Sequence, residues 1–173
     1  MTLPQLFSDL TKTLGSRRRY GRRYRSEALF EKDVWRIVRR RCKRHFGSAR
    51  LSRIVLTSHT GNQGPEERAA WAKFLRSKPG PDVRALGSNN RLDIVVKHPR
   101  RGSIGIEVKC LSSRGHAGKL TQGLGQAVLA LANRQLTLLL IHCGAAPSKQ
   151  QRELRAIARR ICEGSRTRII VVP

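Results

Sequence analysis

Two short alternating segments near the middle of the chain carry the residues best suited to chemistry. Residues 91–97 (RLDIVVK) and 103–109 (SIGIEVK) are predicted to form antiparallel strands joined by a hairpin loop. A register that pairs residue 97 with residue 103 places Asp93 directly opposite Glu107, with Cβ atoms about 5 Å apart. Asp93, Glu107 and Lys109 then share one face, and the other face carries the apolar residues Leu92, Ile94, Val96, Ile104, Ile106 and Val108.

Two carboxylates placed opposite each other repel, and a divalent cation would remove that repulsion. Mg²⁺ prefers oxygen ligands and usually binds one or two carboxylates together with water and phosphate oxygens. Such an ion lowers the pKa of a bound water and neutralises charge on a scissile phosphate. Lys109, on the same face, can orient that water or stabilise the developing negative charge. The residue pattern therefore favours metal-assisted hydrolysis of a phosphodiester.

The segments L-D-I-V-V and I-G-I-E-V-K resemble the core of the PD-(D/E)XK nuclease superfamily, and the resemblance covers roughly residues 26–143. It implies a restriction-endonuclease-like αβββαβ sandwich with a mixed central sheet and flanking helices. It also implies a metal-dependent DNA endonuclease with Mg²⁺ (or Mn²⁺) as its cofactor. The metal ligands expected from the resemblance are Asp93, Glu107 and Val108, with Lys109 as a further catalytic residue.

The resemblance points to two further site positions. Family members commonly add a glutamate from the first helix, which here would be Glu31, with Glu27 one turn earlier as the substitute. Many also carry a glutamine on the helix after the E-x-K strand. Gln126 and Gln122 are the candidates, and their i, i+4 spacing lets both face the site.

The chain departs from the family pattern at two places. Ala130 stands where a tyrosine often follows the glutamine, and Leu92 rather than proline precedes the strand aspartate. A proline–aspartate pair does occur at residues 81–82, in a loop. We rank Asp82 below Asp93 because only Asp93 lies on a predicted paired strand.

The elements that must position these residues follow from hydrophobic periodicity and from breaks in the pattern. Residues 60–90 are irregular and are expected to be an insertion within a single domain over residues 26–173. The predicted order is a mixed α/β arrangement: helix 26–45, strand 51–57, the hairpin, helix 120–134, strand 136–142, a helix from residue 147, and strand 168–172.

Net charge identifies the class of partner. The chain has 36 Lys and Arg against 11 Asp and Glu, a formal net charge of +25 over 173 residues, which concentrates polyanions and favours nucleic acid, DNA in the first place. Residues 1–25 are expected to be a basic arm, with Tyr20 and Tyr24 available to stack on bases and a short amphipathic helix over residues 3–14. The nucleic-acid-binding candidates are Arg17, Arg18, Arg19, Arg22, Arg23, Arg25, Arg114, Lys119 and Gln122.

Several classes of protein are disfavoured. The chain has no run of eighteen apolar residues, no secretory signal pattern and no paired cysteines with zinc-ligand spacing. We expect a cytoplasmic protein with reduced cysteines and no membrane partner, and a homodimer is compatible with the sequence. An alternative with the same fold is a non-catalytic protein that binds or packages nucleic acid, which the charge of +25 also favours. Metal-dependent cleavage distinguishes the enzyme from the packaging protein.

Overall fold

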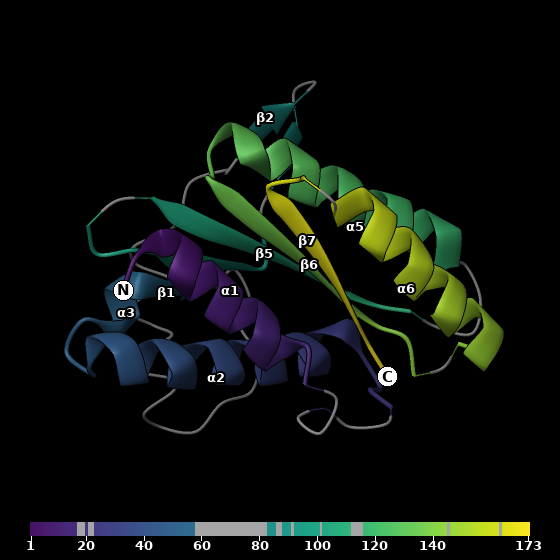
Figure 1. Cartoon of the computed structure of the whole chain (residues 1–173), viewed down its shortest axis with the longest axis horizontal. Coiled ribbons are helices and arrows are strands. Elements are labelled where there is room, and N and C mark those ends of the chain that lie inside the picture. The colour runs from purple at the N-terminus through teal and green to yellow at the C-terminus, as the bar shows by residue number, and fades with distance from the viewer. Residues whose placement is uncertain are drawn as a thin grey trace.

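A five-stranded mixed sheet forms the centre of the computed structural model, in the order β1-β4-β5-β6-β7 (Figure 1). β1 (Val55–Thr57), β4 (Ile94–Lys97) and β5 (Ser103–Cys110) are antiparallel neighbours, whereas β6 (Leu136–His142) and β7 (Thr167–Val172) run parallel to β5. A separate two-stranded sheet pairs β2 (Val83–Ala85) with β3 (Ser88–Asn90). The structure describes residues 1–16, 20, 23–57, 83–85, 88–90, 92–100, 102–111, 116–144, 146–162 and 164–173.

Helices cover both faces of the sheet, as the predicted mixed α/β order requires. Figure 1 shows α1 (Leu3–Leu14) and α2 (Glu27–Phe46) on one side, with the short α3 (Leu51–Ile54) at the end of α2. On the other side lie α5 (His116–Leu129), a 3₁₀ turn (Ala130–Ala132) and α6 (Ser148–Cys162). Within the described part of the chain, no helix is both long enough and apolar enough to cross a membrane.

Alternation along the central strands divides the core into two layers. Ile104, Ile106 and Val108 of β5 belong to the cluster that contacts α1 and α2. Leu139 and Ile141 of β6 belong to a cluster on the opposite face, against α5 and α6. Every residue of β5 is buried, as a strand with a neighbour on each side and helices on both faces should be.

The hairpin register confirms the prediction over four residue pairs, from Lys97 with Ser103 to Ile94 with Ile106. The first strand is shorter than expected, because it begins at Ile94 and Asp93 lies in the bend before it. Leu92 was expected to share a face with Ile94, but it belongs to a separate cluster with Leu56 and Val95 on the opposite face. The bend at Asp93 reverses the alternation that an uninterrupted strand would keep.

The N-terminal helix is part of the core, so residues 3–14 are not a free arm, whereas residues 17–19, 21 and 22 of the expected basic arm lie outside the described residues. The helix predicted over residues 3–14 is present, and its Leu6, Leu10 and Leu14 are fully buried. A capping box between Thr2 and Gln5 fixes its first turn. A helix with that much apolar surface is more stable against the sheet than in water.

The two tyrosines expected to stack on bases are also used inside the protein. Tyr20 and Tyr24 both pack against Phe30 of α2, with ring centroids 5.5 and 5.1 Å away. The Tyr20 hydroxyl donates to the carbonyl of Leu14 at 2.9 Å, and the Tyr24 hydroxyl donates to Asp33 at 2.9 Å. These contacts tie Tyr20 and Tyr24 themselves to the core.

Two other elements differ from their predicted bounds. The predicted strand 51–57 begins as the single helical turn of α3, and only Val55–Thr57 form β1. The predicted helix 120–134 begins four residues earlier and ends in the 3₁₀ turn.

Candidate active site

The candidate site lies at the start of β4, where β5 continues beyond Ile106 without this neighbour. β4 accompanies β5 only as far as Ile106, whereas β5 runs on to Cys110. Two carboxylates take the place of the missing strand. The backbone N–H of Val108 donates to Oδ2 of Asp93 at 2.8 Å, and that of Cys110 donates to Oε2 of Glu27 at 2.9 Å.

The carbonyl groups of Val108 and Cys110 face the same open edge, because the N–H and C=O of one strand residue point to the same side. The ammonium of Lys119 donates to the Cys110 carbonyl at 3.1 Å. The edge therefore presents two carboxylates, one cation and the carbonyl of Val108 within a few residues of each other.

The side chains of Glu107 and Lys109 lie on the face of the sheet that α5 covers, opposite the apolar residues Ile104, Ile106 and Val108 of β5. They are 1% and 6% exposed. Nζ of Lys109 lies 2.7 Å from Oε1 of Glu107 and 3.7 Å from Oε1 of Glu27. The other carboxylate oxygen of Glu107, Oε2, is buried and accepts no hydrogen bond from the residues that the structure describes.

Burial and like charge shift the titration of this pair. Burial, and next the nearby charge of Asp93, raise the pKa of Glu107 to about 8, although the hydrogen bond from Lys109 acts in the opposite direction. Burial opposes the charge of Lys109, but its hydrogen bond with Glu107 and the surrounding carboxylates outweigh that cost and raise the pKa of Lys109. Lys109 is therefore a protonated ammonium at neutral pH.

Gly123 of α5 lets this helix lie directly over the ion pair. A Cβ at this position would lie 2.8 Å from Cγ of Lys109 and 2.9 Å from Cδ1 of Leu139, both closer than side chains tolerate. At Gly125, on the same helix, a Cβ would meet nothing within 4 Å. The glycine at 123 thus sets how the Lys109 stem is packed.

The structure brings most of the predicted strand and helix residues together. Asp93, Glu107 and Lys109 lie close together at the start of β4, although Asp93 is not paired with Glu107 in the ladder. Glu27, which the sequence offered as the alternative to Glu31, is the glutamate of α2 that contacts the β5 backbone. Glu31 is buried one turn further along α2, 3% exposed, and replaces Glu27 in none of these contacts.

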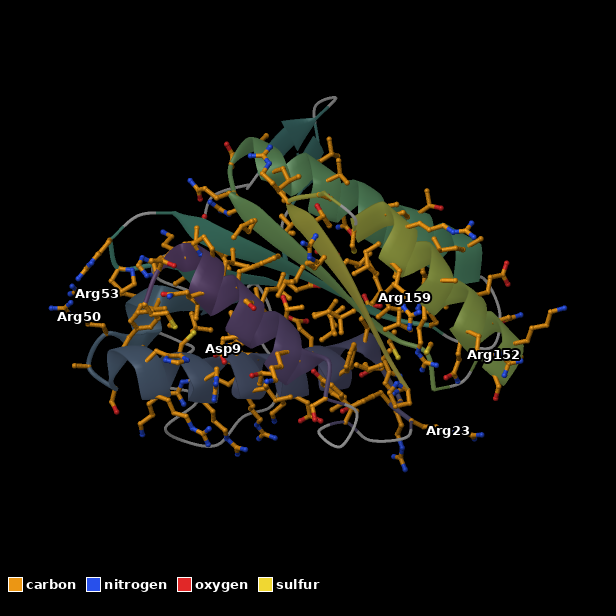
Figure 2. All side chains as sticks on the ribbon, in the orientation of Figure 1. Asp9, Arg23, Arg50, Arg53, Arg152 and Arg159 are labelled. Carbon is orange, nitrogen blue, oxygen red and sulfur yellow. The ribbon has the colours of Figure 1, made fainter. Side chains whose placement is uncertain are left out.

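The glutamines and the cationic candidates have mixed outcomes. On α5, Gln126 is half-buried three residues after Gly123, and Gln122 is exposed. Arg23 and Arg25 are exposed just before α2, and Figure 2 shows Arg23 extending away from the protein. Arg17, Arg18, Arg19, Arg22, Arg114 and Asp82 lie outside the described residues.

The donor set suits a hard cation only if water or substrate completes it. Among the residues the structure describes, no group of three or more His, Cys, Asp and Glu side chains is arranged to hold a metal ion. Mg²⁺ needs only one or two carboxylates from the protein. The buried Oε2 of Glu107 beside the charge of Asp93 is such a pair, so the residues fit the ion.

Three features of the site escaped the sequence analysis. The roles of Glu27 and Lys119 as partners of the β5 backbone depend on where β4 begins, which the strand pattern placed too early. The close approach at Gly123 was visible only as a glycine inside a helix, a signal that favours close packing.

Comparisons with models of protein families, with curated proteins and with solved structures found no match.

Proposed function

We propose that this protein is a metal-dependent nuclease that hydrolyses phosphodiester bonds in DNA, on a restriction-endonuclease-like arrangement of its α/β fold. The observation that carries the proposal is the grouping of Asp93, Glu107 and Lys109 at the start of β4. Ordinary folding gains nothing from a buried glutamate whose pKa is raised to about 8 by burial and a neighbouring aspartate.

Each residue has a distinct part in this proposal. Asp93 accepts a hydrogen bond from the Val108 N–H at 2.8 Å, which fixes its carboxylate at the open edge of β5, where a cation would bind. Lys109, kept protonated by Glu107, can donate to a phosphate oxygen and stabilise negative charge that develops there. Glu27 sits 3.7 Å from the Lys109 ammonium and helps to orient it.

The raised pKa of Glu107 makes cation binding at the site depend on pH. With a pKa of about 8, Glu107 is largely protonated at pH 7, so a cation that binds its carboxylate must displace a proton. Mg²⁺ or Mn²⁺, once bound, supplies charge neutralisation at the scissile phosphate and hydroxide at neutral pH. We therefore expect cleavage to increase from pH 6 to pH 8.

A second candidate function is non-catalytic binding of nucleic acid on the same fold. One observation favours it: Lys109 contacts Glu107 at 2.7 Å and offsets part of the repulsion from Asp93 without a metal. The same charge of +25 would serve binding alone.

Cleavage of a substrate panel separates the two candidates. Single-stranded, duplex and branched DNA and RNA of one sequence are incubated with the protein in Mg²⁺, Mn²⁺ or EDTA. The nuclease cleaves DNA in either metal and not in EDTA, and Glu107→Gln abolishes cleavage but not binding. Binding to every substrate with no metal-dependent product would support the second candidate and contradict the first.

A further inference from the structure

The outward face of α2 is strongly basic from residue 34 onward. Residues 34–57 contain eight Lys and Arg and no Asp or Glu. On α2 the apolar residues of this stretch, among them Val34, Val38 and Cys42, are buried against the sheet. The cations therefore gather on the solvent side of the helix, because that is the side left to them.

Four of these cations line one hollow in the surface. Arg36, Arg39, Arg40 and Lys43 of α2 enclose about 150 Å³ together with Leu51, the first residue of α3. Figure 2 shows Arg50 and Arg53 extending from the same end of the molecule, beside α3. Like charges gathered around a shared hollow repel, and an anion within it would relieve that repulsion.

Neighbouring residues of α2 hold two of the side chains in the hollow in place, but carboxylates neutralise few of its cations. The guanidinium of Arg39 lies over the Trp35 ring, 5.5 Å from its centroid. Arg36 forms an ion pair with Asp33 at 3.7 Å. In the described part of the chain no carboxylate lies within ion-pair distance of Arg39, Arg40 or Lys43, whereas the neighbouring Arg41 is bound to Asp9.

We propose that this hollow, lined by Arg36, Arg39, Arg40 and Lys43, is a binding site for the phosphate backbone of the nucleic acid substrate. The choice of ligand rests on the proposed function. Arg and Lys clustered on one face neutralise phosphates, and such contacts position a nucleic acid without reading its sequence. The site would anchor the substrate at a distance from the reacting bond.

Helix geometry gives that distance. Along α2, Arg36 lies nine residues and Lys43 sixteen residues from Glu27, which is about 14 to 24 Å at 1.5 Å per residue. The two groups lie on opposite faces of α2, so a strand that joins them must be at least this long. At about 3.4 Å per nucleotide, a substrate needs roughly seven nucleotides beyond the reacting bond to fill the hollow.

The surface fits nucleic acid better than a membrane. A helix that lies on a membrane needs bulky apolar side chains on its outer face. Between Arg36 and Lys43 the apolar residues of α2, Ile37, Val38 and Cys42, are all buried. The side chains that remain on the surface here are cationic, and a polyanion with regularly spaced charges can pair with several of them at once.

Binding in EDTA tests the inference without cleavage. The variant Arg39→Gln/Arg40→Gln/Lys43→Gln is compared with Arg152→Gln/Arg159→Gln/Arg160→Gln on α6, which removes the same charge from exposed positions on the other side of the sheet (Figure 2). Fluorescence anisotropy of labelled 20-base-pair and 6-base-pair duplexes is measured from 50 to 300 mM salt. The double variant Arg40→Gln/Lys43→Gln, which keeps Arg39 over Trp35, guards against misfolding of the triple variant.

The α2 variant should bind the 20-base-pair duplex at least tenfold more weakly at 150 mM salt. Its log–log salt slope should fall by up to about 2.7, at about 0.9 for each phosphate that the variant no longer neutralises. The α6 variant should change the slope by less than about 0.9, the value for a single phosphate, and the 6-base-pair duplex, which can occupy the hollow on its own, should also bind the α2 variant more weakly than the α6 variant. Equal losses of affinity in the two variants, no loss in either, or a loss confined to anionic vesicles would overturn the inference. If no metal supports cleavage but the α2 variant still binds more weakly, the proposed nuclease fails and the phosphate site stands.

Discussion

The stability of this protein should fall as pH rises from 5 to 8, because Glu107 is buried beside Asp93. Its folded pKa of about 8 lies above its ordinary value of 4.5. A carboxyl group with a raised folded pKa favours the unfolded state once pH exceeds the ordinary value. The cost grows until pH passes the folded pKa, and it is constant above that.

The expected size follows from the two pKa values. At pH 5 little of the cost is present, and at pH 8 most of the difference between 4.5 and about 8 contributes. With about 1.36 kcal/mol for each pKa unit, the free energy of unfolding should decline by roughly 3 to 4 kcal/mol between these pH values. That is a large share of the roughly 5 to 15 kcal/mol that stabilises an ordinary domain.

Urea unfolding in EDTA, followed by circular dichroism at pH 5, 6, 7 and 8, measures the decline. Glu107→Gln removes the titrating group and should flatten the curve, and Asp93→Asn should reduce the decline by removing the repelling charge. Glu153→Gln, an exposed position on α6, is the matched control and should follow the wild type. A wild-type curve that is flat, or one that Glu107→Gln leaves equally steep, would refute the assignment of a strained carboxylate pair.

Three further predictions follow from contacts of named residues. Gly123→Ala should lower cleavage and cost about 1 to 3 kcal/mol of stability, since its Cβ meets the Lys109 stem, whereas Gly125→Ala should be neutral or up to about 1 kcal/mol more stable in urea titrations. Arg41 first, and His45 as well, lower the pKa of Asp9 from 3.8 to about 2, so this carboxylate stabilises the fold above pH 4 and the effect is lost as pH falls through 2. Asp9→Asn should therefore cost about 2 kcal/mol at pH 7, and urea curves of wild type and variant should converge at pH 2. Mn²⁺ should raise the melting temperature at pH 8, much less at pH 5, and not at all in Asp93→Asn; an equal rise in that variant would place the ion elsewhere.

Much of the sheet could be predicted because its pattern is simple. The register of β4 and β5 follows from alternation in two segments that share a short hairpin, and β6 follows from an unbroken apolar run. Those features are local in the sequence. They sufficed to place Asp93 near Glu107 and Lys109, and to place Glu107 and Lys109 on the face opposite Ile104, Ile106 and Val108 of β5.

The features that could not be predicted from the sequence depend on contacts between distant segments. The expected arm included residues 3–14, but the helix stripe of Leu6, Leu10 and Leu14 packs against the sheet. The choice between Glu27 and Glu31 depended on how far β4 accompanies β5, and a strand pattern cannot show where pairing stops. The capping box at Thr2 was a local signal that could have indicated an ordered N-terminus.

Nicking of supercoiled plasmid DNA by four matched variants tests the central claim most directly. Asp93→Asn, Glu107→Gln and Lys109→Met each remove one member of the site, and Glu153→Gln leaves it intact. We expect wild type and Glu153→Gln to nick the plasmid in Mg²⁺ or Mn²⁺ and not in EDTA, and the three site variants to bind it normally but to nick it at least about a hundredfold more slowly. Nicking by all three site variants at the wild-type rate, or no nicking by the wild type in either metal, would contradict the proposed nuclease site.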